Sequence, residues 1–296
     1  MDLPVTVIGG YLGAGKTTLV NHLLRHANGL RYAVLVNEFG DLSIDSDLIE
    51  AEEDGMISIS GGCVCCAFGG DLIGALDDML AMQPRPDHVL IEASGVALPA
   101  SVATTVGMMQ GMRADGIVVL ADADQVQQNA ANPYLSDTIT RQLAQADIVL
   151  LTKADLATKL GGALGVERVT AWLREKAPGT RILPVTRGEV PAAAILGALP
   201  LPARGHAPGA DAHGAFASVV LTPDHAVDAE RLARALADDP GVTRAKGFVR
   251  TADGLALIHV VGHRHEVEAA LGAHPVGVVC IGLKSEFDAD RLQGLV

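Results

Sequence analysis

Three of the chain's four cysteines fall within four residues, in the sequence GGCVCC. Cys63, Cys65 and Cys66 are candidate ligands for zinc or cobalt, because thiophilic ions are bound by thiolates. A structural zinc site usually takes four ligands, so three thiolates leave one position to be filled. That ligand could come from Glu38, Asp41, a histidine, water or a partner protein. An incomplete ligand set suits a site that must release its metal.

The thiols have three other interpretations. They could be buried apolar side chains, a redox pair, or an adventitious metal site. Glycines on both sides of the segment indicate a loop, and a redox pair more often has the spacing Cys-x-x-Cys. Cys280 lies in an apolar stretch and is expected to be an ordinary core residue.

A complete phosphate-binding loop, G-x-x-x-x-G-K-T, lies between a predicted strand and a predicted helix. Its glycines let backbone amides point inward around phosphates, and the helix N-terminus adds partial positive charge. The lysine is expected to reach the β- and γ-phosphates, and the threonine hydroxyl to ligate Mg²⁺. The predicted phosphate-binding residues are Gly10, Gly13, Ala14, Gly15, Lys16, Thr17 and Thr18.

A second motif predicts which base is bound. Thr152, Lys153 and Asp155 follow a predicted strand. A carboxylate there can accept hydrogen bonds from N1–H and the exocyclic amine of guanine, where adenine offers no matching donors. Two such bonds, at about 1.5–3 kcal/mol each, would favour binding of guanine over adenine by orders of magnitude. The Lys153 stem would pack along the base. The alternative is that Asp155 only caps a solvated helix.

Acidic residues at other strand ends complete the predicted nucleotide site. Glu92 follows a buried strand and could hold Mg²⁺ through water, and Gly95 could give its amide to the γ-phosphate. Glu38 ends the second predicted strand, where a switch loop would contact nucleotide and metal. We therefore expect Lys16, Glu38 and Glu92 to take part in catalysis. Asp122 is a further candidate for this polar rim.

Strand and helix signals alternate through the first two thirds of the chain. Short runs rich in β-branched residues or leucine predict strands buried on both faces of a sheet. The predicted strands are 5–8, 32–36, 56–59, 88–91, 116–120 and 148–151. The predicted helices are 16–27, 71–82, 136–146 and 166–176. This alternation predicts an α/β fold with a doubly wound, mostly parallel sheet and ligands at the carboxyl ends of its strands.

A change of composition divides the chain. Residues 199–214 are rich in proline and glycine with little apolar periodicity, which predicts a linker. We therefore expect a P-loop GTPase domain over 1–198 and a small α+β domain over 215–296. Within the small domain we expect a helix near 266–271.

Composition also excludes some classes of protein. The net charge of −13 argues against nucleic-acid binding, which needs clustered lysine and arginine. The sequence contains no run of about 18 uncharged apolar residues, so we expect no membrane-spanning helix. The residues before the first predicted strand have no basic n-region, so we expect no signal peptide. We therefore expect a cytoplasmic protein without nucleic-acid or membrane partners, in a compartment that keeps its thiols reduced.

Taken together, these motifs resemble those of the CobW-type family of metallochaperone GTPases, which includes zinc chaperones, cobalamin-synthesis proteins and nitrile hydratase activators. The likeness covers nearly the whole chain, and Gly-Cys-x-Cys-Cys is its most specific element. The matching motifs are 10–18, 37–40, 61–66, 92–95 and 152–155. The resemblance implies GTP hydrolysis coupled to delivery of zinc or cobalt. It makes Cys63, Cys65 and Cys66 the metal ligands and Glu92 the Mg²⁺-linked carboxylate.

The chain departs from the family pattern in two places. Thr152 stands where asparagine is commoner in the family, a replacement expected to loosen the selection of the base. The linker lacks the histidine-rich tract of some members, which argues against metal storage and leaves the expectation of metal delivery unchanged.

The sequence therefore predicts a Mg²⁺-dependent GTPase that cycles between GTP and GDP and delivers zinc or cobalt to a client metalloprotein. A homodimer is compatible with the sequence. The alternatives are an ATP-dependent small-molecule kinase and a non-catalytic metal sensor or interaction module. Competition between ATP and GTP separates the kinase from the GTPase, and a sensor would show no metal-stimulated turnover.

Overall fold

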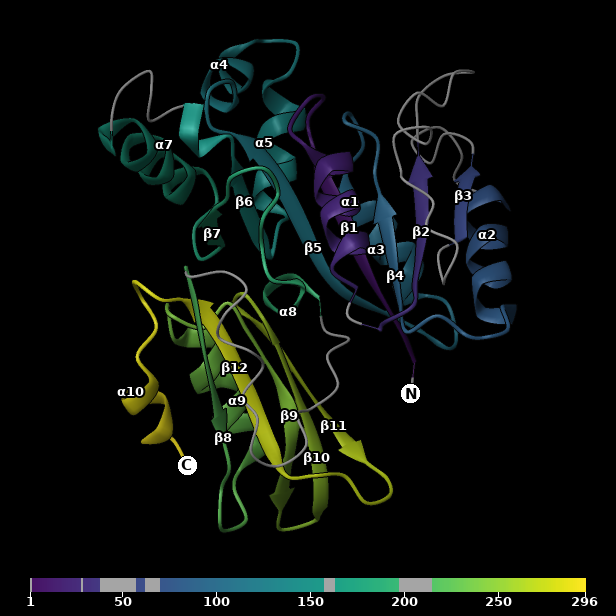
Figure 1. The fold of residues 1–296 in the computed structure, drawn as a ribbon, viewed down its shortest axis with the longest axis vertical. Coiled ribbons are helices and arrows are strands. Elements are labelled where there is room, and N and C mark those ends of the chain that lie inside the picture. Colours follow the sequence, from purple (N-terminus) through teal and green to yellow (C-terminus); the bar gives the residue numbers. More distant parts are fainter. Residues whose placement is uncertain (1, 28, 38–56, 62–69, 157–162, 197–214) are drawn as a thin grey trace. The chain divides into compact units, whose positions relative to one another are not determined.

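The computed structural model describes the chain apart from residues 1 and 28 and the segments 38–56, 62–69, 157–162 and 197–214. The predicted linker, 199–214, lies outside the described residues. The chain divides into two compact units, Met1–Glu189 and Val190–Val296. Figure 1 shows the elements of both units.

The first unit alternates strands and helices. Its strands are β1 (Leu3–Gly10), β2 (Tyr32–Asn37), β3 (Ile57–Gly61), β4 (His88–Glu92), β5 (Met112–Asp122), β6 (Ile148–Thr152) and β7 (Arg181–Pro184). Its helices are α1 (Lys16–Arg25), α2 (Gly70–Ala81), α3 (Pro99–Gly107), α4 (Val126–Ala131), α5 (Ser136–Ala144) and α7 (Ala163–Lys176).

Among the described residues, these seven strands form one sheet in the order β3-β2-β4-β1-β5-β6-β7. Every pairing between neighbours in it is parallel. β1 is therefore central, between β4 and β5. Since parallel strands all end at one edge, the loops that follow them gather there.

Helices cover both faces of this sheet, which explains why its central strands are buried and mostly apolar. On one face, α2 and α3 pack over β1, β2 and β4, and α4, α5 and α7 pack over β5 and β6. Leu19 and Leu23 of α1 are fully buried on the other face, and Figure 1 shows α1 in front of the sheet with α3 and α5 behind it. The predicted P-loop, doubly wound fold class is confirmed.

The second unit is a smaller α+β arrangement. Its strands are β8 (Phe216–Leu221), β9 (Arg244–Thr251), β10 (Gly254–Val261), β11 (Arg264–Ala270) and β12 (Gly277–Leu283). Its helices are α8 (Ala192–Ile195), α9 (Ala229–Asp238) and α10 (Ala289–Gln293). In the described chain its five strands form an antiparallel sheet in the order β11-β10-β9-β12-β8. Leu232 and Leu236 of α9 pack into the core on one face.

The helix predicted near 266–271 is wrong, because β11 occupies most of that stretch. β11 pairs antiparallel with β10 from Leu255↔Ala270 to Val261↔Arg264. Gly262, with φ 58°, makes the tight turn between the two strands. The glutamates and alanines of this segment favour helix intrinsically, but pairing across a short hairpin overrides that preference.

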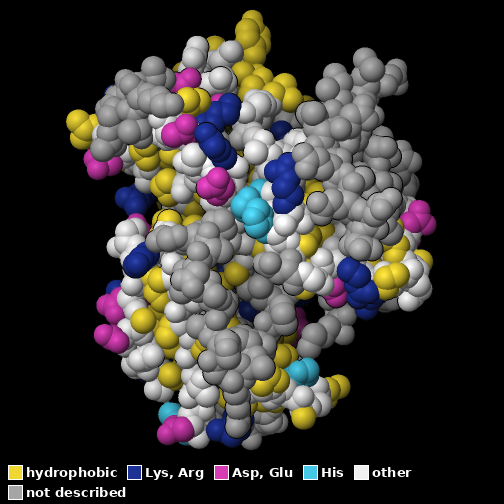
Figure 2. All heavy atoms as spheres, in the orientation of Figure 1, with side chains coloured by type: hydrophobic (Ala, Val, Ile, Leu, Met, Phe, Trp, Pro, Cys, Tyr) yellow, Lys and Arg dark blue, Asp and Glu magenta, His cyan; other side chains and the backbone are white. Residues whose placement is uncertain are grey.

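Positive and negative side chains are mixed on the surface of the protein. On the face drawn in Figure 2, the described lysines and arginines are interspersed with acidic side chains. Within the described part of the chain, no helix combines the length and apolar character needed to cross a bilayer.

Candidate nucleotide site

The predicted nucleotide-binding residues gather at the carboxyl edge of the parallel sheet. The phosphate-binding loop leaves β1 at Gly10, and Glu92 ends the adjacent strand β4. On the other side of β1, Asp122 ends β5 and pairs in register with Thr152, the last residue of β6. Residues from four strands therefore meet around one loop.

The phosphate-binding loop turns away from β1 at Gly10, whose φ is 129°. A Cβ at this position would lie 2.5 Å from the carbonyl oxygen of Leu120 in β5, so neither conformation nor space admits a side chain. Gly13 and Gly15 are also left-handed, at φ 74° and 99°. The first turn of α1 has no acidic residue, which leaves its positive pole to an anion.

Lys16 directs its ammonium back into the loop. Its Nζ donates to the carbonyl oxygens of Gly10, at 3.1 Å, and Tyr11, at 3.4 Å. The residue is buried. Its charge adds to the positive pole of α1, so the loop suits a polyphosphate.

Thr17 and Glu92 meet although they are 75 residues apart in the sequence. The Thr17 hydroxyl donates to Glu92 Oε1 at 3.1 Å, and Glu92 is only 2% exposed. Hydroxyl and carboxylate oxygens are the donors that Mg²⁺ takes in proteins, and the ion keeps several of its waters. Two adjacent oxygen donors beside a phosphate-binding loop fit that ion.

The turn after Glu92 lies directly against the phosphate-binding loop. A Cβ on Gly95 would be 2.8 Å from the backbone nitrogen of Leu12. The turn is also tied to α5, because Gln142 Nε2 donates to the carbonyl oxygens of Gly95 and Ala97. Gln142 was missed in the sequence, since a single glutamine in an amphipathic helix belongs to no motif.

Thr152 connects the predicted base-recognition motif to the phosphate-binding loop. Its hydroxyl donates to the carbonyl oxygen of Ala14 at 2.8 Å, with Ala121 as a more distant acceptor at 3.3 Å. Thr152 is 5% exposed. Threonine at this position therefore holds the loop through a buried hydrogen bond.

Lys153 and Asp155 extend from the same motif. Lys153 has an unusual φ of 56°, and its Nζ forms a 2.7 Å ion pair with Asp122 Oδ2. The other oxygen of Asp122 accepts from the amide of Asp124 at 2.9 Å, so both carboxylate oxygens are fixed. Asp155 is exposed and is therefore accessible to a ligand.

The loop after β7 is a further neighbour of α1 that the motifs did not indicate. Gly188 has φ 74°, and a Cβ there would lie 3.3 Å from Leu19 Cα. Arg187 is also left-handed, with φ 54°. This loop therefore lies against the first turns of α1, next to the exposed Thr18.

Glu38 and the predicted metal ligands Cys63, Cys65 and Cys66 lie outside the described residues. The strands that lead to them are described: β2 ends at Asn37, in register with Gly61 at the end of β3. The two strands thus end side by side at the carboxyl edge of the sheet. Among the described residues, no three His, Cys, Asp or Glu side chains form a metal-binding group.

Cys280 is confirmed as a core residue of the second unit. It is fully buried. Burial, with a smaller contribution from the negative charge of Asp239, raises the pKa of its thiol to about 12. A metal ligand must be a thiolate, so Cys280 is unsuited to that role at neutral pH.

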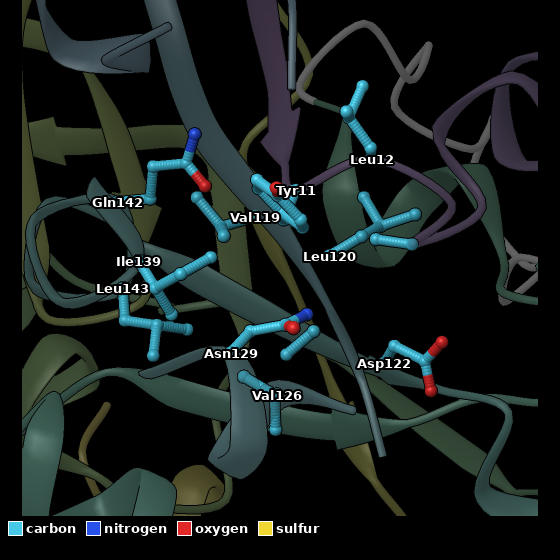
Figure 3. A pocket seen from close by; sticks show the side chains of 12 residues that line it. Tyr11, Leu12, Val119, Leu120, Asp122, Val126, Asn129, Ile139, Gln142 and Leu143 are labelled. Atoms are coloured by element: carbon cyan, nitrogen blue, oxygen red, sulfur yellow. The ribbon is translucent and has the colours of Figure 1, made fainter. Parts of the chain in front are cut away.

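A small cavity lies behind the phosphate-binding loop, between β5 and the helices α4 and α5. Figure 3 shows Gln142, Ile139 and Leu143 on one side of it and Tyr11 and Leu12 on the other. The cavity is mostly apolar. It leaves free volume beside the buried amide of Gln142.

A parallel sheet with this loop after its first strand defines the P-loop nucleotide-binding class. The CobW/HypB/UreG nucleotide-binding domain matches residues 4–183, and the cobalamin synthesis protein CobW C-terminal domain matches residues 216–296. The chain therefore belongs to the CobW/HypB/UreG family, which confirms the resemblance inferred from its motifs.

Several curated proteins are similar in sequence. The chain is 32% identical over 226 residues to "Zinc chaperone CobW" of a Sinorhizobium species, which covers 66% of this chain and 62% of the relative. It is 32% identical over 196 residues to "Zinc chaperone YjiA" of Escherichia coli, covering 64% and 59%. It is 35% identical over 178 residues to "Zinc-regulated GTPase metalloprotein activator 1" of Schizosaccharomyces pombe, covering 57% and 42%. The chain thus spans less than two thirds of the length of these relatives.

Solved structures are similar at lower identity. A zinc-bound triple mutant of the YjiA GTPase has a TM-score of 0.48 and 22% identity, covering 100% of this chain and 98% of that one. The hydrogenase maturation factor HypB of Archaeoglobus fulgidus has a TM-score of 0.42 and 18% identity, covering 62% and 81%.

The bond from Thr152 to Ala14 gives a first prediction. Thr152→Val should lower the free energy of unfolding by about 1–3 kcal/mol, because it leaves the Ala14 carbonyl buried and unpaired. It should also weaken nucleotide binding, since that carbonyl belongs to the phosphate-binding loop. Thr152→Ser keeps the hydroxyl and should stay close to wild type. Urea unfolding and titration of a fluorescent GDP measure both effects, and equal behaviour of the two variants would contradict the assignment.

Proposed function

We propose that the chain is a cytoplasmic, Mg²⁺-dependent GTPase that binds zinc or cobalt through Cys63, Cys65 and Cys66 and delivers it to a client metalloprotein. The observation that carries the proposal is the contact between Thr17 and Glu92 at 3.1 Å. It joins the phosphate-binding loop to β4, and β2 separates β4 from β3, the strand that precedes the cysteine segment.

The phosphate-binding loop supports the nucleotide half of the proposal. Lys16 is held inside the loop by the carbonyls of Gly10 and Tyr11, and can turn its donors to the β- and γ-phosphates. Thr17 and Glu92 would hold Mg²⁺, directly and through water. When bound, the ion neutralises charge that develops on the phosphates. The Gly95 amide would face the γ-phosphate and stabilise its equatorial oxygens.

The residues after β6 support selection of guanine. Asp155 is exposed and can accept from N1–H and the exocyclic amine of the base. Lys153 is anchored at its ammonium by Asp122, at 2.7 Å. This anchor stretches the aliphatic stem between two strand ends, where it would form a flat apolar wall for the purine. Thr152 fixes the start of this motif to the phosphate-binding loop.

Strand order supports the coupling of metal to nucleotide. The cysteine segment begins directly after β3, and Glu38 directly after the adjacent strand β2. β3 lies three strand positions from β1 in the sheet. At about 4.8 Å per strand, the two strands are roughly 14 Å apart, a distance that a short loop can span. A loop that contacts the γ-phosphate can therefore also contribute to the thiolate site.

The names of the relatives support the cargo and the client. Zinc chaperones and a zinc-regulated GTPase metalloprotein activator are among the proteins this chain resembles. Zinc or cobalt is the cargo in this scheme and binds soft thiolates, whereas Mg²⁺ binds hard oxygens. The two kinds of ion are thus sorted by ligand chemistry.

Replacement of Asp155 tests the nucleotide specificity. In the wild type, unlabelled GTP should displace a fluorescent GTP analogue far better than ATP does. Asp155→Asn should lower GTP affinity by about 10- to 100-fold, the loss of one or two charge-assisted hydrogen bonds. It should also improve xanthosine triphosphate binding, because an amide can donate to the added carbonyl of xanthine. Equal displacement by ATP and GTP in the wild type would contradict the proposal.

Replacement of the cysteines tests the metal site. The double variant Cys65→Ala, Cys66→Ala should lose the zinc that the wild type binds at about one ion per chain. Cys280→Ala is the matched control and should keep that zinc. Zinc affinity should fall as pH is lowered, because thiols with a pKa of about 8.5 must lose protons to bind. Equal zinc content in the double variant, measured by metal analysis after dialysis, would reject these ligands.

A further inference from the structure

We propose that Gln142 is a positioning residue that holds the turn 94–97 ready for the γ-phosphate, and so makes the site prefer GTP to GDP. The inference rests on the proposed function, because it takes the Gly95 amide to be a γ-phosphate ligand. It assigns a role to a side chain from α5, an element that carries none of the nucleotide motifs.

Gln142 clamps the turn with both hydrogens of its amide. Nε2 donates to the carbonyl oxygen of Gly95 at 3.1 Å and to that of Ala97 at 2.7 Å. The residue is 1% exposed, so these bonds are shielded from water. A buried amide that loses its acceptors is strongly unfavourable, and the same holds for the carbonyls. The side chain and the turn therefore hold each other in place.

The clamped turn also fixes the direction of the Gly95 amide. Within it, the amide of Ala97 donates to the carbonyl oxygen of Ser94 at 2.9 Å. That carbonyl and the Gly95 N–H belong to the same planar peptide group and point in opposite directions. Fixing one therefore fixes the other. With the carbonyls of Gly95 and Ala97 also held, the orientation of the amide is set before any ligand arrives.

The turn is fixed next to the place where phosphate would bind. The amide of Ala93 donates to the carbonyl oxygen of Ile8 at 2.8 Å, which ties the chain to β1 just before the turn. Gly95 then approaches Leu12 so closely that a Cβ would lie 2.7 Å from its Cδ2. The turn and the phosphate-binding loop are thus in backbone contact.

Packing holds the Gln142 side chain less firmly than it would hold a side chain in a close-packed core. Its side chain lines the small cavity in Figure 3, opposite Tyr11 and Leu12. A side chain beside free volume loses van der Waals contacts on that side. Its position therefore depends more on its two hydrogen bonds than it would in a close-packed core.

A preformed turn favours one nucleotide over the other. The γ-phosphate is present in GTP and absent from GDP, so only GTP gains from an amide that is already oriented. Without the clamp, GTP would have to order the turn as it binds. GDP, whose phosphates contact the glycine loop, Lys16 and Thr17, would be bound as before.

Gln142→Met tests this role, because methionine has a similar length and no donor. Affinities are measured for a non-hydrolysable GTP analogue and for GDP. The variant should bind the analogue about 5- to 30-fold more weakly, the effect of losing one or two buried hydrogen bonds, with GDP affinity unchanged. Gln145→Met is the control, at the residue that follows the last turn of α5, since the side-chain oxygen of Gln145 has no hydrogen-bond partner among the described residues. It should leave the ratio of the two affinities as in the wild type.

The outcomes separate this inference from the proposed function. If Gln142→Met leaves the ratio unchanged, or weakens both nucleotides equally, Gln142 has only a structural role and the inference is wrong. If the wild type binds neither nucleotide, the proposed function itself is wrong.

Hydrogen exchange of the wild type gives a second test that needs no variant. The Ala97 amide should be protected in the nucleotide-free protein, because the clamped turn is already formed. Protection that develops only with the GTP analogue would overturn the inference.

Discussion

The parallel pairing of β1 with β4 on one side and β5 on the other is the constraint on which the rest of the site depends. It sets the end of β4, with Glu92, and the end of β5, with Asp122, on either side of the phosphate-binding loop. The loop can leave β1 only because Gly10 has no side chain, since a Cβ would lie 2.5 Å from the Leu120 carbonyl oxygen. Moving β5 away would displace the loop and Lys16 with it.

Hydrogen bonds that are buried or part-buried then join motifs that are far apart in the sequence. Thr17 bonds to Glu92, Thr152 to Ala14, and Gln142 to the turn after Glu92. A buried polar group must keep its partner, so a displacement at one contact is transmitted to the next. Hydrogen bonds therefore join the phosphate-binding loop to Glu92 and to Thr152, and the turn after Glu92 to α5. To act as a full switch, such a network must favour one state by about 5.5 kcal/mol when its ligand binds.

The sequence predicted those parts of the fold and site whose signals are local. The phosphate-binding loop and the strands of the parallel sheet follow from glycine spacing and apolar runs. In the structure Thr17 bonds to Glu92, and Lys16 turns back to the Gly10 carbonyl. The helix predicted near 266–271 is wrong: the glutamates and alanines there favour a helix, but pairing with β10 makes most of the stretch part of β11. Gln142 and the hydroxyl of Thr152 act through carbonyls 45 or more residues away, which no local pattern encodes.

In the proposed function, nucleotide and metal occupancy are energetically linked at this edge of the sheet. The most direct test is calorimetric titration of a non-hydrolysable GTP analogue with and without zinc, and of zinc with and without the analogue. The account predicts that zinc tightens binding of the analogue by the same factor as the analogue tightens binding of zinc, because linkage is reciprocal. GDP should show a smaller effect. An affinity for the analogue that is identical with and without zinc would contradict the account.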